Sequence, residues 1–539
     1  MIGFRNRLPA MNVNGRHNGT YNNEEGGCPC CYTVNDSRLG QFLHHLRNAV
    51  YDDRRLVFID GKVLCCSNNW IRDHTHEMKA FRHWEYDLTS FLDFIIDTQQ
   101  ENGRYFELIK QLDDFHWKFV DESCRRIYEE DNVALVRLEL EADIEYLVVE
   151  AAEMCFKATG DLGWLNRILP RLEKGIDYLT SDPKRWDPSL GLVIRPFTID
   201  TWDFTYGKPG NNRRIEPGDP MAAMHGDSSG AYDAMRILAS FRRLLGDSGK
   251  AAEWDGRAED IRKAMIKHLW NGRFFIHQLH LNSGGADGLE NERLSLSNVY
   301  DINRGVTDLS QSRSIISEYM RRGETTEAFA EWFTVDPPYP EFNGYGPGRY
   351  VNGAISPFTA GELARAAFEN GYEEYGWDII SRFMDMMERD GNIYFVYSPD
   401  DGKPQGGGPS GWGAAALMSA VDEGLAGITD TDHGYGRLGF SPRFPVTGYD
   451  ELRYVTGYEK SSAYVDVRYI LVPEGMRYDI KSPASRVDAH IMLPKGRKPG
   501  SLLVNGEAAE SKAVTVGDTV YADFSCQGKG DYSLELIFG

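Results

Sequence analysis

Cysteine is scarce in this sequence of 539 residues, and that scarcity excludes a fold built on disulfides. The eight cysteines are Cys28, Cys30, Cys31, Cys65, Cys66, Cys124, Cys155 and Cys526. Thiolates are good zinc ligands, so the residue 28–31 cluster and the residue 65–66 pair could bind zinc. Their spacing fits no standard zinc ribbon or finger, however, because Cys28 and Cys31 form one CxxC pair and no second pair follows it. We therefore expect reduced thiols, no metal and no other cofactor.

An excess of positive charge is also absent. The sequence has 59 Lys and Arg against 81 Asp and Glu, a net charge of −22. Nucleic acids and anionic membranes bind clustered cations, so neither is an expected partner. No apolar run approaches the roughly 18 residues of a membrane span. Residues 1–23 lack the apolar core of a signal peptide. We expect a soluble cytoplasmic protein that could form homo-oligomers.

Apolar and aromatic residues are plentiful, at 41% and 12% of the chain, so a large core is expected and disorder as the main state is excluded. Residues 431–539 carry 13 basic and 14 acidic side chains, so nearly all of the acidic excess precedes them. There the sequence changes from amphipathic segments to short alternating runs such as 461–472. We predict an N-terminal extension (1–35), a helical domain (36–430) and a C-terminal β-sandwich-like domain (431–539).

Hydrophobic periodicity predicts twelve helices in the first part. Their ranges are 36–52, 76–99, 104–126, 139–159, 162–180, 227–246, 250–270, 309–321, 324–334, 358–370, 372–389 and 411–425. Between two of them, Gly160 is a suitable C-cap and Asp161 a suitable N-cap. Twelve helices are the count of an (α/α)6 toroid, and no fixed repeat of a solenoid is visible. Because the loops of a toroid meet at one mouth, we expect the chemistry in the loops.

A first candidate cluster, Trp70, Arg72 and Asp73, lies just before a predicted helix. Tryptophan offers a flat face to a sugar ring, and Arg and Asp offer directional hydrogen bonds to hydroxyl groups. The alternative is local: Asp73 caps the helix and pairs with Arg72.

A second cluster places Asp203 between Trp202 and Phe204. An acid lodged between aromatic rings loses solvation, which raises its pKa as a general acid at neutral pH requires. The alternative is an ordinary capping or ion-paired aspartate.

A third cluster contains His225 and Asp227 at the head of a predicted helix. His225 could reach a ligand at the mouth, whereas Asp227 or Ser228 could simply cap the helix. The segment has no GxSxG motif and no strand–elbow–helix setting, which argues against a serine hydrolase.

A fourth cluster spans two stretches of the chain. Arg349 and Asn352 precede the predicted helix at 358–370, and Tyr397, Asp400 and Asp401 follow it.

The glycine-rich stretch 406–408 leads to Trp412 at the head of the last predicted helix. No GxGxxG or GxxxxGK[ST] motif follows a strand, so this stretch is interpreted as a flexible lid and not a nucleotide site. Trp412 is either a sugar platform or a core residue.

Taken in order, the clusters resemble the (α/α)6-barrel, or six-hairpin, glycosidases. That group includes trehalases, glucoamylases, mannosylglycerate hydrolases and α-rhamnosidases, with disaccharide phosphorylases as more distant relatives. WIRD (70–73) is similar to the WxRD motif whose Arg and Asp hold the sugar, and TWDF (201–204) to the trehalase loop whose Asp is the general acid. YVNGAISP (350–357) resembles a helix entry of the phosphorylases, and GWG (411–413) the Gly-Trp before the last barrel helix.

The resemblance covers roughly residues 65–510 and implies a role for most of the candidates. The residues that it implies for holding the sugar, or that lie beside them at the mouth, are Trp70, Arg72, Asp73, Trp202, His225, Asp227, Arg349, Asn352, Tyr397 and Trp412.

One departure concerns the general base. Hydrolases of this group often carry it in a Glu-x-Tyr stretch before the final helix, but the matching stretch here, 394–397, has Phe395 at the expected Glu position. Three outcomes stay open: the base is Asp400 or Asp401, it comes from another loop through Glu341, or phosphate is the nucleophile as in the phosphorylases.

The leading prediction is an inverting exo-acting glycoside hydrolase of a short glycoside or oligosaccharide, whose small-molecule substrate is neutral in keeping with the acidic chain. Asp203 protonates the leaving oxygen, and a second carboxylate about 6.5–9.5 Å away activates water. Alternatives are a phosphorylase, a non-catalytic sugar-binding protein, and a sugar isomerase or epimerase. The isomerase requires two histidines that face each other, drawn from His74, His76, His83, His225, His277 and His280.

Overall fold

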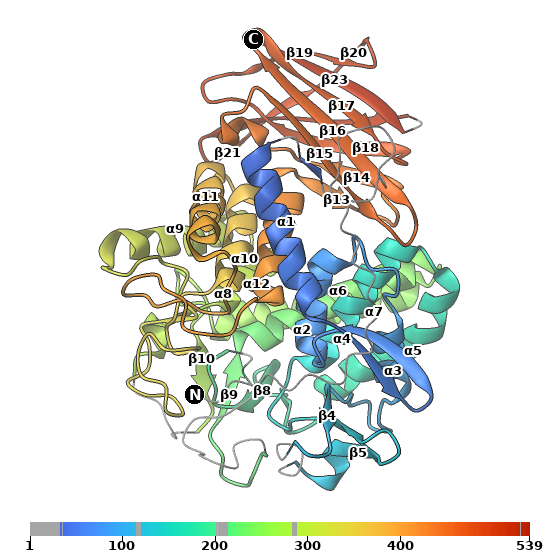
Figure 1. The fold of residues 1–539 in the computed structure, drawn as a ribbon, viewed down its shortest axis with the longest axis vertical. Coiled ribbons are helices and arrows are strands. Elements are labelled where there is room, and N and C mark those ends of the chain that lie inside the picture. The colour runs from blue at the N-terminus through green and yellow to red at the C-terminus, as the bar shows by residue number, and fades with distance from the viewer. Residues whose placement is uncertain are drawn as a thin grey trace.

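The computed structural model describes residues 33–34, 36–114, 120–200, 202, 214–282, 288–528 and 530–539. The chain folds into a mainly helical part, which ends at Leu425, and a C-terminal part built from strands (Figure 1). In Figure 1 the C-terminal strands lie at one end of the molecule, and short strands from the helical part lie at the opposite end.

Six helices of the first part contact one another in cyclic order. They are α2 (Ile71–Phe81), α4 (Ile144–Thr159), α6 (His225–Leu244), α8 (Ser297–Asn303), α10 (Pro357–Glu369) and α12 (Gly411–Ser419). Each packs against the next, and α12 packs against α2, so the six form a closed ring. A π-helical turn, Ala420–Leu425, extends α12.

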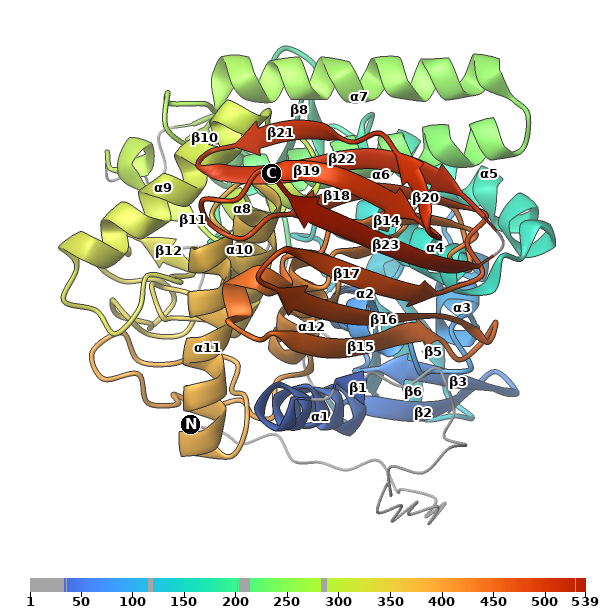
Figure 2. The same cartoon turned by 90° about the horizontal axis from the view of Figure 1, so that it is seen from above.

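Six further helices alternate with the ring helices along the chain. They are α1 (Ser37–Asp52), α3 (Ser90–Asp97), α5 (Leu162–Leu179), α7 (Ser248–His268), α9 (Leu309–Thr325) and α11 (Glu373–Asp390). Each packs against at least one ring helix, for example α1 on α12 and α7 on α6. Figure 2 shows α7 at the outer edge of the helical part.

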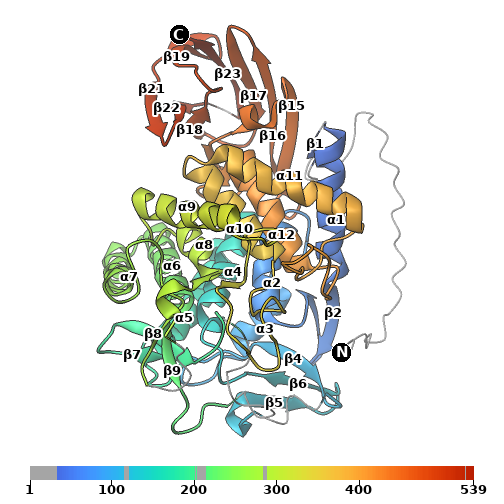
Figure 3. The same cartoon turned by 90° about the vertical axis from the view of Figure 1, so that its left-hand side faces the viewer.

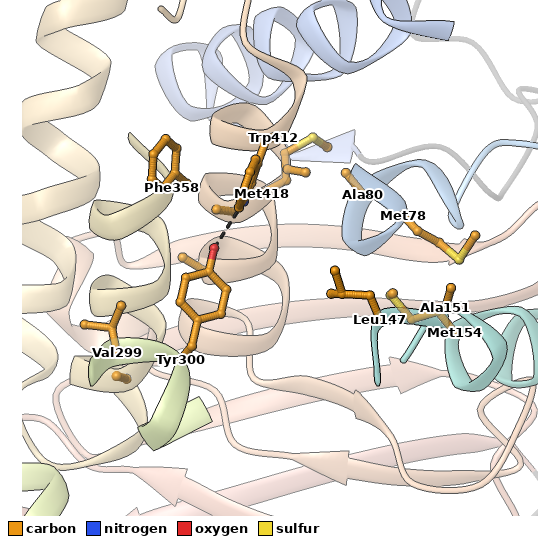
Figure 4. Close-up of a cluster of buried hydrophobic side chains, with 14 of the residues drawn as sticks. Met78, Ala80, Leu147, Ala151, Met154, Val299, Tyr300, Phe358, Trp412 and Met418 are labelled. Atoms are coloured by element: carbon orange, nitrogen blue, oxygen red, sulfur yellow. Dashed lines mark hydrogen bonds between the residues drawn. The ribbon is translucent and has the colours of Figure 1, made fainter. Parts of the chain in front are cut away.

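Apolar side chains fill the ring, and Figure 4 shows part of this core between α2, α4, α8, α10 and α12. Glycine permits a close crossing of two ring helices. A Cβ atom on Gly361 of α10 would lie 2.4 Å from a backbone carbon of Ala416 in α12. The predicted caps between α4 and α5 are confirmed, since Gly160 has φ +66° and the Asp161 side chain accepts from the Trp164 N–H.

The ring helices begin at a common end. The Arg72 side chain in the first turn of α2 binds Asp143 directly before α4, and Gly226 at the start of α6 meets Ser297 at the start of α8. The start of α12 likewise touches Pro357 of α10. We call this end the N-terminal face of the ring.

The helical part also contains short strands. They are β2 (Arg54–Ile59), β3 (Lys62–Ser67), β4 (Leu108–Gln111), β5 (Arg125–Tyr128), β6 (Val133–Val136), β7 (Trp186–Asp187), β8 (Leu192–Pro196), β9 (Met221–Met224), β10 (Gln278–His280), β11 (Leu294–Ser295) and β12 (Val335–Asp336). They form the sheets β2-β3, β4-β6-β5, β10-β9-β8-β7 and β11-β12. Strands β9 and β11 lead into α6 and α8, which places them at the N-terminal face. Figure 3 shows β9 on the side of the helical part away from the C-terminal strands.

The C-terminal part contains two sheets. One has the order β1-β15-β16-β17-β23-β19-β20 and the other β13-β14-β18-β22-β21. The strands are β1 (Thr33–Val34), β13 (Ile428–Asp430), β14 (Arg437–Phe440), β15 (Glu451–Tyr458), β16 (Ala463–Val472), β17 (Gly475–Lys481), β18 (Arg486–Met492), β19 (Pro499–Val504), β20 (Glu507–Ala509), β21 (Lys512–Val516), β22 (Thr519–Gln527) and β23 (Asp531–Phe538). Strand β1 pairs with β15, so a segment of the expected N-terminal extension joins this sheet. The domain boundaries stay a prediction.

Three predicted helices are wrong. The range 76–99 is not one helix, because α2 ends at Phe81 and α3 begins only at Ser90. The range 104–126 contains strand β4 and the first two residues of β5, which pair with β6, and the apolar residues Leu108 and Ile109 of β4 are buried. No described helix occupies 326–334, where the chain crosses between α9 and β12. The seven-residue helix α8 was not predicted.

Candidate active site at the N-terminal face of the ring

The sequence clusters meet at the N-terminal face, although they are scattered along the chain. Trp70 is the N-cap residue of α2 and has no side-chain cap, and Arg72 and Asp73 lie in the first turn. His225 and Asp227 open α6, and Trp412 opens α12. First turns offer unpaired N–H groups and the positive end of the helix dipole, which favours carboxylates and hydroxyl ligands there.

Arg72 is the most strongly bonded residue of the first cluster. Its guanidinium donates two hydrogen bonds to Asp143, with Nε–Oδ2 2.5 Å and Nη2–Oδ1 2.9 Å, and it also pairs with Glu141. Asp73 accepts from the Asn68 side chain at 3.3 Å, and Arg72 forms ion pairs with Glu141 and Asp143 in the segment before α4. The Trp70 side chain lies under the Lys110 ammonium, which is 5.4 Å from its ring centre.

A second buried ion cluster holds the segment before α4. Arg137 donates to both carboxylate oxygens of Glu145 at 3.0 Å and to the Glu141 carbonyl at 2.7 Å. Glu107 lies 3.6 Å from the same guanidinium, and burial raises its pKa to about 8. The segment before α4 is thus held from two sides, by Arg72 at the Glu141 and Asp143 carboxylates and by Arg137 at the Glu141 carbonyl.

Trp202 is placed by Arg195 of strand β8. The Arg195 Nη2 donates to the Trp202 carbonyl at 2.5 Å, and the indole is 6% exposed with its ring 5.3 Å from Tyr350 and 5.8 Å from Phe395. Asp203, the predicted general acid, follows Trp202 directly in the sequence and lies outside the described residues.

His225 belongs to a buried chain of four side chains. Its Nδ1 lies 2.5 Å from Asp301 Oδ2 and its Nε2 lies 2.8 Å from Ser295 Oγ, which in turn donates to Asp200 at 3.1 Å. Burial lowers the pKa of His225, but the Asp301 carboxylate outweighs it and holds this pKa above its usual value. Both ring nitrogens of His225 are therefore bonded, and its side chain is fully buried.

The order Asp301–His225–Ser295 is that of a serine-hydrolase triad, but it lacks an exposed nucleophile. Ser295 is fully buried and its hydroxyl is bonded to both His225 and Asp200. This geometry agrees with the sequence in arguing against a serine hydrolase.

Asp200 was not predicted, yet it lies at the centre of this region. It is 1% exposed and has φ +46°, a left-handed backbone that non-glycine residues adopt only when their surroundings hold it. Its side chain accepts from Ser295 and Ser297, and its N–H donates to His277 Nε2 at 3.0 Å. The loop that leads to Trp202 is thus fixed at Asp200 as well.

Asp227 is fully buried beside Arg195, with 3.6 Å between Oδ1 and Nη1. Burial raises its pKa to about 6, against the opposing effect of Arg195. The predicted capping role is absent, because Met224 is the N-cap residue of α6.

The proposed base candidates lie on exposed loops. Glu341 accepts from the Gly344 N–H within its own turn, and Asp401 pairs with Lys403 at 2.7 Å, which lowers the pKa of Asp401. Asp400 is also exposed, as is Arg349.

Asn352 and Tyr397 have structural partners. The Asn352 side chain is buried and joins the Tyr339 and Tyr345 backbones through bonds of 2.8–2.9 Å. The Tyr397 hydroxyl accepts from the Tyr394 N–H at 3.0 Å. Both residues therefore shape the loops before α10 and α12.

Trp412 is packed on its ring faces and bonded at its nitrogen. His76 stacks on it at 4.2 Å and Phe358 at 5.0 Å. Its indole N–H donates to the Tyr300 hydroxyl at 3.1 Å, as Figure 4 shows. Of the two interpretations of Trp412, this arrangement favours core packing.

The family profile described as mannosylglycerate hydrolase MGH1-like glycoside hydrolase domain matches residues 68–413. The chain belongs to this glycoside hydrolase family. The match begins just before WIRD and ends at GWG, so it covers all four clusters.

Solved structures with a similar fold are distant in sequence. An α-L-rhamnosidase from Dictyoglumus thermophilum has 12% identity and a TM-score of 0.60, over 94% of this chain and 50% of its own. A rhamnosidase from Bacillus sp. GL1 has 15% identity and a TM-score of 0.58, over 86% and 42%. A mannosylglycerate hydrolase from Thermus thermophilus, in complex with glucose, has 16% identity and a TM-score of 0.50, over 70% and 99%.

This glycoside hydrolase chain spans half or less of the length of the two rhamnosidases. A search of curated proteins finds no significant match. No helix among the described residues is long and apolar enough to cross a membrane.

The histidines considered for an isomerase contact other protein groups in the described part of the chain. His277 and His280 both contact Glu290, and His83 lies 2.9 Å from the Gly457 carbonyl. His74 accepts from the Ser67 N–H at 3.1 Å. Within the described ranges, no group of His, Cys, Asp and Glu has the arrangement of a metal site.

Burial raises the pKa of the Cys65 and Cys66 thiols, which keeps both protonated. Cys28, Cys30 and Cys31, their predicted partners in a zinc site, lie outside the described residues.

A polar cavity of about 190 Å³ lies at the opposite end of the ring, where Asp430 and Tyr458 of the C-terminal part help to line it. Its charged side chains are mostly paired with one another, as in Arg304–Glu150 at 2.9 Å and Lys157–Glu153 at 3.0 Å.

The partners of the first-turn residues were missed by sequence reasoning. Glu141 and Asp143 precede an apolar helix in ELEADI, and Arg195 is a lone cation in the apolar strand LVIRP. A single charge inside an apolar segment is a usable signal, because buried charges need partners.

Proposed function

We propose that the chain is an inverting exo-acting glycoside hydrolase of a short glycoside, with its active site at the N-terminal face of the ring. The observation that carries the proposal is the meeting of the sugar-hydrolase motifs at this one face, within the segment that matches the family. We further infer that the closed ring and its outer helices form an (α/α)6 toroid, which ends near residue 430 and precedes a β-sandwich-like domain.

Asp203 is the proposed general acid. It follows Trp202, whose carbonyl accepts a hydrogen bond from Arg195 and whose ring is buried. A general acid at neutral pH has to keep its proton until the leaving oxygen takes it.

Trp70, Arg72, Asp73 and Trp202 are proposed to hold the terminal sugar, with His225, Asp227, Arg349, Asn352, Tyr397 and Trp412 around them. The contacts of Arg72 support a positioned guanidinium, since Asp143 and Glu141 fix its plane. His225, Asn352 and Trp412 are bonded to or packed against buried protein groups, so their proposed contribution is to the shape of the site.

The second carboxylate is proposed to be Glu341, Asp400 or Asp401. All three are exposed on loops, so water reaches them, as a general base that activates water requires. An inverting pair needs about 6.5–9.5 Å between the two carboxyl groups, which residues on different loops can provide.

Phosphorolysis is the second candidate, and the residue at position 395 favours it. Phe395 packs 5.8 Å from Trp202 and 5.1 Å from Phe358, so the expected Glu position holds an aromatic ring. A chain without a protein base would use phosphate as nucleophile.

A glycoside library assayed with and without phosphate tests the proposal. The panel includes mannosides, rhamnosides and glucosides, because the similar structures are a mannosylglycerate hydrolase with glucose and two rhamnosidases. We expect phosphate-independent release of a free reducing sugar and its loss in Asp203→Asn. A sugar 1-phosphate as product would establish phosphorolysis, and undiminished turnover by Asp203→Asn would refute the acid assignment.

A further inference from the structure

We propose that Arg137 is a positioning residue for sugar binding: it holds the helix start whose Asp143 fixes the plane of the Arg72 guanidinium. This inference rests on the proposed function, because it takes Arg72 as a residue that holds the terminal sugar. Arg137 belongs to none of the four sequence clusters and directly follows strand β6.

Asp143 is the N-cap residue of α4, but its side chain does not cap the helix. An aspartate at this position usually accepts a hydrogen bond from a backbone N–H of the first turn. Here both carboxylate oxygens accept from Arg72 instead, at 2.5 Å and 2.9 Å. Two parallel bonds of this kind fix the plane of a guanidinium. Because the start of α4 orients Arg72, the position of this helix start has to be fixed by another group.

Arg137 is that group, because it bonds to the chain on both sides of Asp143. Its Nη2 donates to the Glu141 carbonyl oxygen, before Asp143, at 2.7 Å. Its Nη1 and Nη2 also donate to the two carboxylate oxygens of Glu145, in the first turn of α4, at 3.0 Å each. The side chains of Arg137, Asp143 and Glu145 are all buried. A shift of Arg137 would therefore move the carboxylate that orients Arg72.

Glu107 connects Arg137 to the start of α2. The Glu107 carbonyl accepts from the Ile71 N–H at 2.7 Å, directly before Arg72. The Glu107 side chain accepts from the Leu138 N–H at 3.1 Å, directly after Arg137. The backbone that carries Arg72 and the segment that carries Arg137 are thus bonded to the same residue.

Arg443 provides a matched control for substitutions of a buried arginine. It is also buried and donates to the Gly424 and Ser441 carbonyls at 2.6 Å and 2.9 Å, but it lies in the C-terminal part of the chain. Lysine keeps the positive charge of arginine and loses its planar fork of donors. Arg137→Lys and Arg443→Lys should therefore both lower the unfolding free energy, whereas only Arg137→Lys should affect sugar binding.

A double-variant cycle on KM separates positioning from mere stability. Arg137→Lys is made in the wild type and in Arg72→Lys, and all variants are assayed with the glycoside that the library assay identifies. An oriented Arg72 binds the sugar in both the ground state and the transition state, so its loss raises KM and leaves kcat unchanged.

We expect Arg137→Lys to raise KM of the wild type about 10- to 100-fold with kcat within about threefold, as the loss of one charge-assisted hydrogen bond to the sugar predicts. In the Arg72→Lys variant, which has already lost the oriented fork, the same substitution should change KM by less than about twofold. Arg443→Lys should leave KM unchanged in both. An equal rise of KM in the two backgrounds, no rise in the wild type, or an unchanged KM in Arg72→Lys would overturn the inference.

Two further arms keep the outcomes distinct. If Arg137→Lys does not fold, Glu145→Gln weakens the same bonds of Arg137 and is compared in the same cycle. If the wild type cleaves no glycoside, the proposed function fails and the inference with it. If the wild type and its Asp203→Asn variant behave as expected but the cycle shows no coupling between Arg137 and Arg72, only the inference fails.

Discussion

The Arg72 guanidinium and the Asp143 carboxylate form two hydrogen bonds, of 2.5 and 2.9 Å, between the first turn of α2 and the N-cap of α4. This pair is buried, so Asp143→Asn leaves an incompletely compensated charge in the interior. We expect the variant to lose about 3 kcal/mol of unfolding free energy. Urea denaturation measures it.

The control for this prediction is Glu535→Gln, which breaks the exposed pair Arg477–Glu535. Exposed pairs contribute little, so a loss below about 1 kcal/mol is expected there. Equal losses in both variants would show that the Arg72–Asp143 bond does not stabilise the face.

A substitution at Gly361 tests the close approach of α10 and α12 in the closed ring. An added Cβ would lie 2.4 Å from the Ala416 backbone, so Gly361→Ala forces α10 and α12 apart and should cost about 2–3 kcal/mol. Gly256→Ala in α7 is the control, since a Cβ there meets nothing within 4 Å and alanine should gain about 0.5–1 kcal/mol. Thermal unfolding of both variants decides; a stabilised Gly361→Ala would refute the close crossing.

A substitution at Tyr300 tests the hydrogen bond that the buried Trp412 indole donates to the Tyr300 hydroxyl. Tyr300→Phe removes the acceptor of the Trp412 indole N–H and leaves it buried without a partner, at a cost of about 1–3 kcal/mol. Tyr469→Phe deletes a buried hydroxyl that has no hydrogen-bond partner, so it should be neutral or stabilising. Similar losses in the two variants would contradict the role of the Tyr300 hydroxyl.

Asp422 makes stability depend on pH. Burial, reinforced by Glu423, raises its pKa in the folded chain to about 7, above the roughly 3.9 of an unfolded aspartate. The folded state therefore binds the proton more tightly, and unfolding releases it between these two values. The unfolding free energy that Asp422 contributes is full below about pH 4 and is lost as pH rises through about 7.

Asp422→Asn removes this dependence. We expect the variant to gain stability over the wild type from pH 4 to 8, by up to about 4 kcal/mol, as shown by urea denaturation at several pH values. Glu451→Gln, at an exposed position, is the control. Its difference in unfolding free energy from the wild type should not change with pH. If the difference in unfolding free energy between Asp422→Asn and the wild type did not change with pH, the raised pKa of Asp422 would be contradicted.

The sequence predicts helices best where caps and periodicity agree. The predicted 162–180 and 358–370 correspond to Leu162–Leu179 and Pro357–Glu369, because Asp161 and Ser356 cap the first turns. It fails at 104–126, where short apolar runs are ambiguous between helix and strand until their pairing with β6 decides.

For the candidate site, too, the sequence predicts some features and not others. Its motif residues can be recognised locally, but their partners cannot, because the bond between Arg72 and Asp143 joins residues 71 positions apart. Likewise Asp301 lies 76 residues from His225, so only the folded ring shows that this histidine is bonded on both sides.

The anomeric configuration of the first product tests the central claim most directly. Proton NMR of a fresh reaction, recorded before mutarotation, follows the anomeric proton of the sugar that the wild type releases. An inverting hydrolase with Asp203 as its acid predicts a free sugar of the opposite configuration to the substrate, and none from Asp203→Asn with an alkyl glycoside. Release of a sugar with the retained configuration would contradict the account.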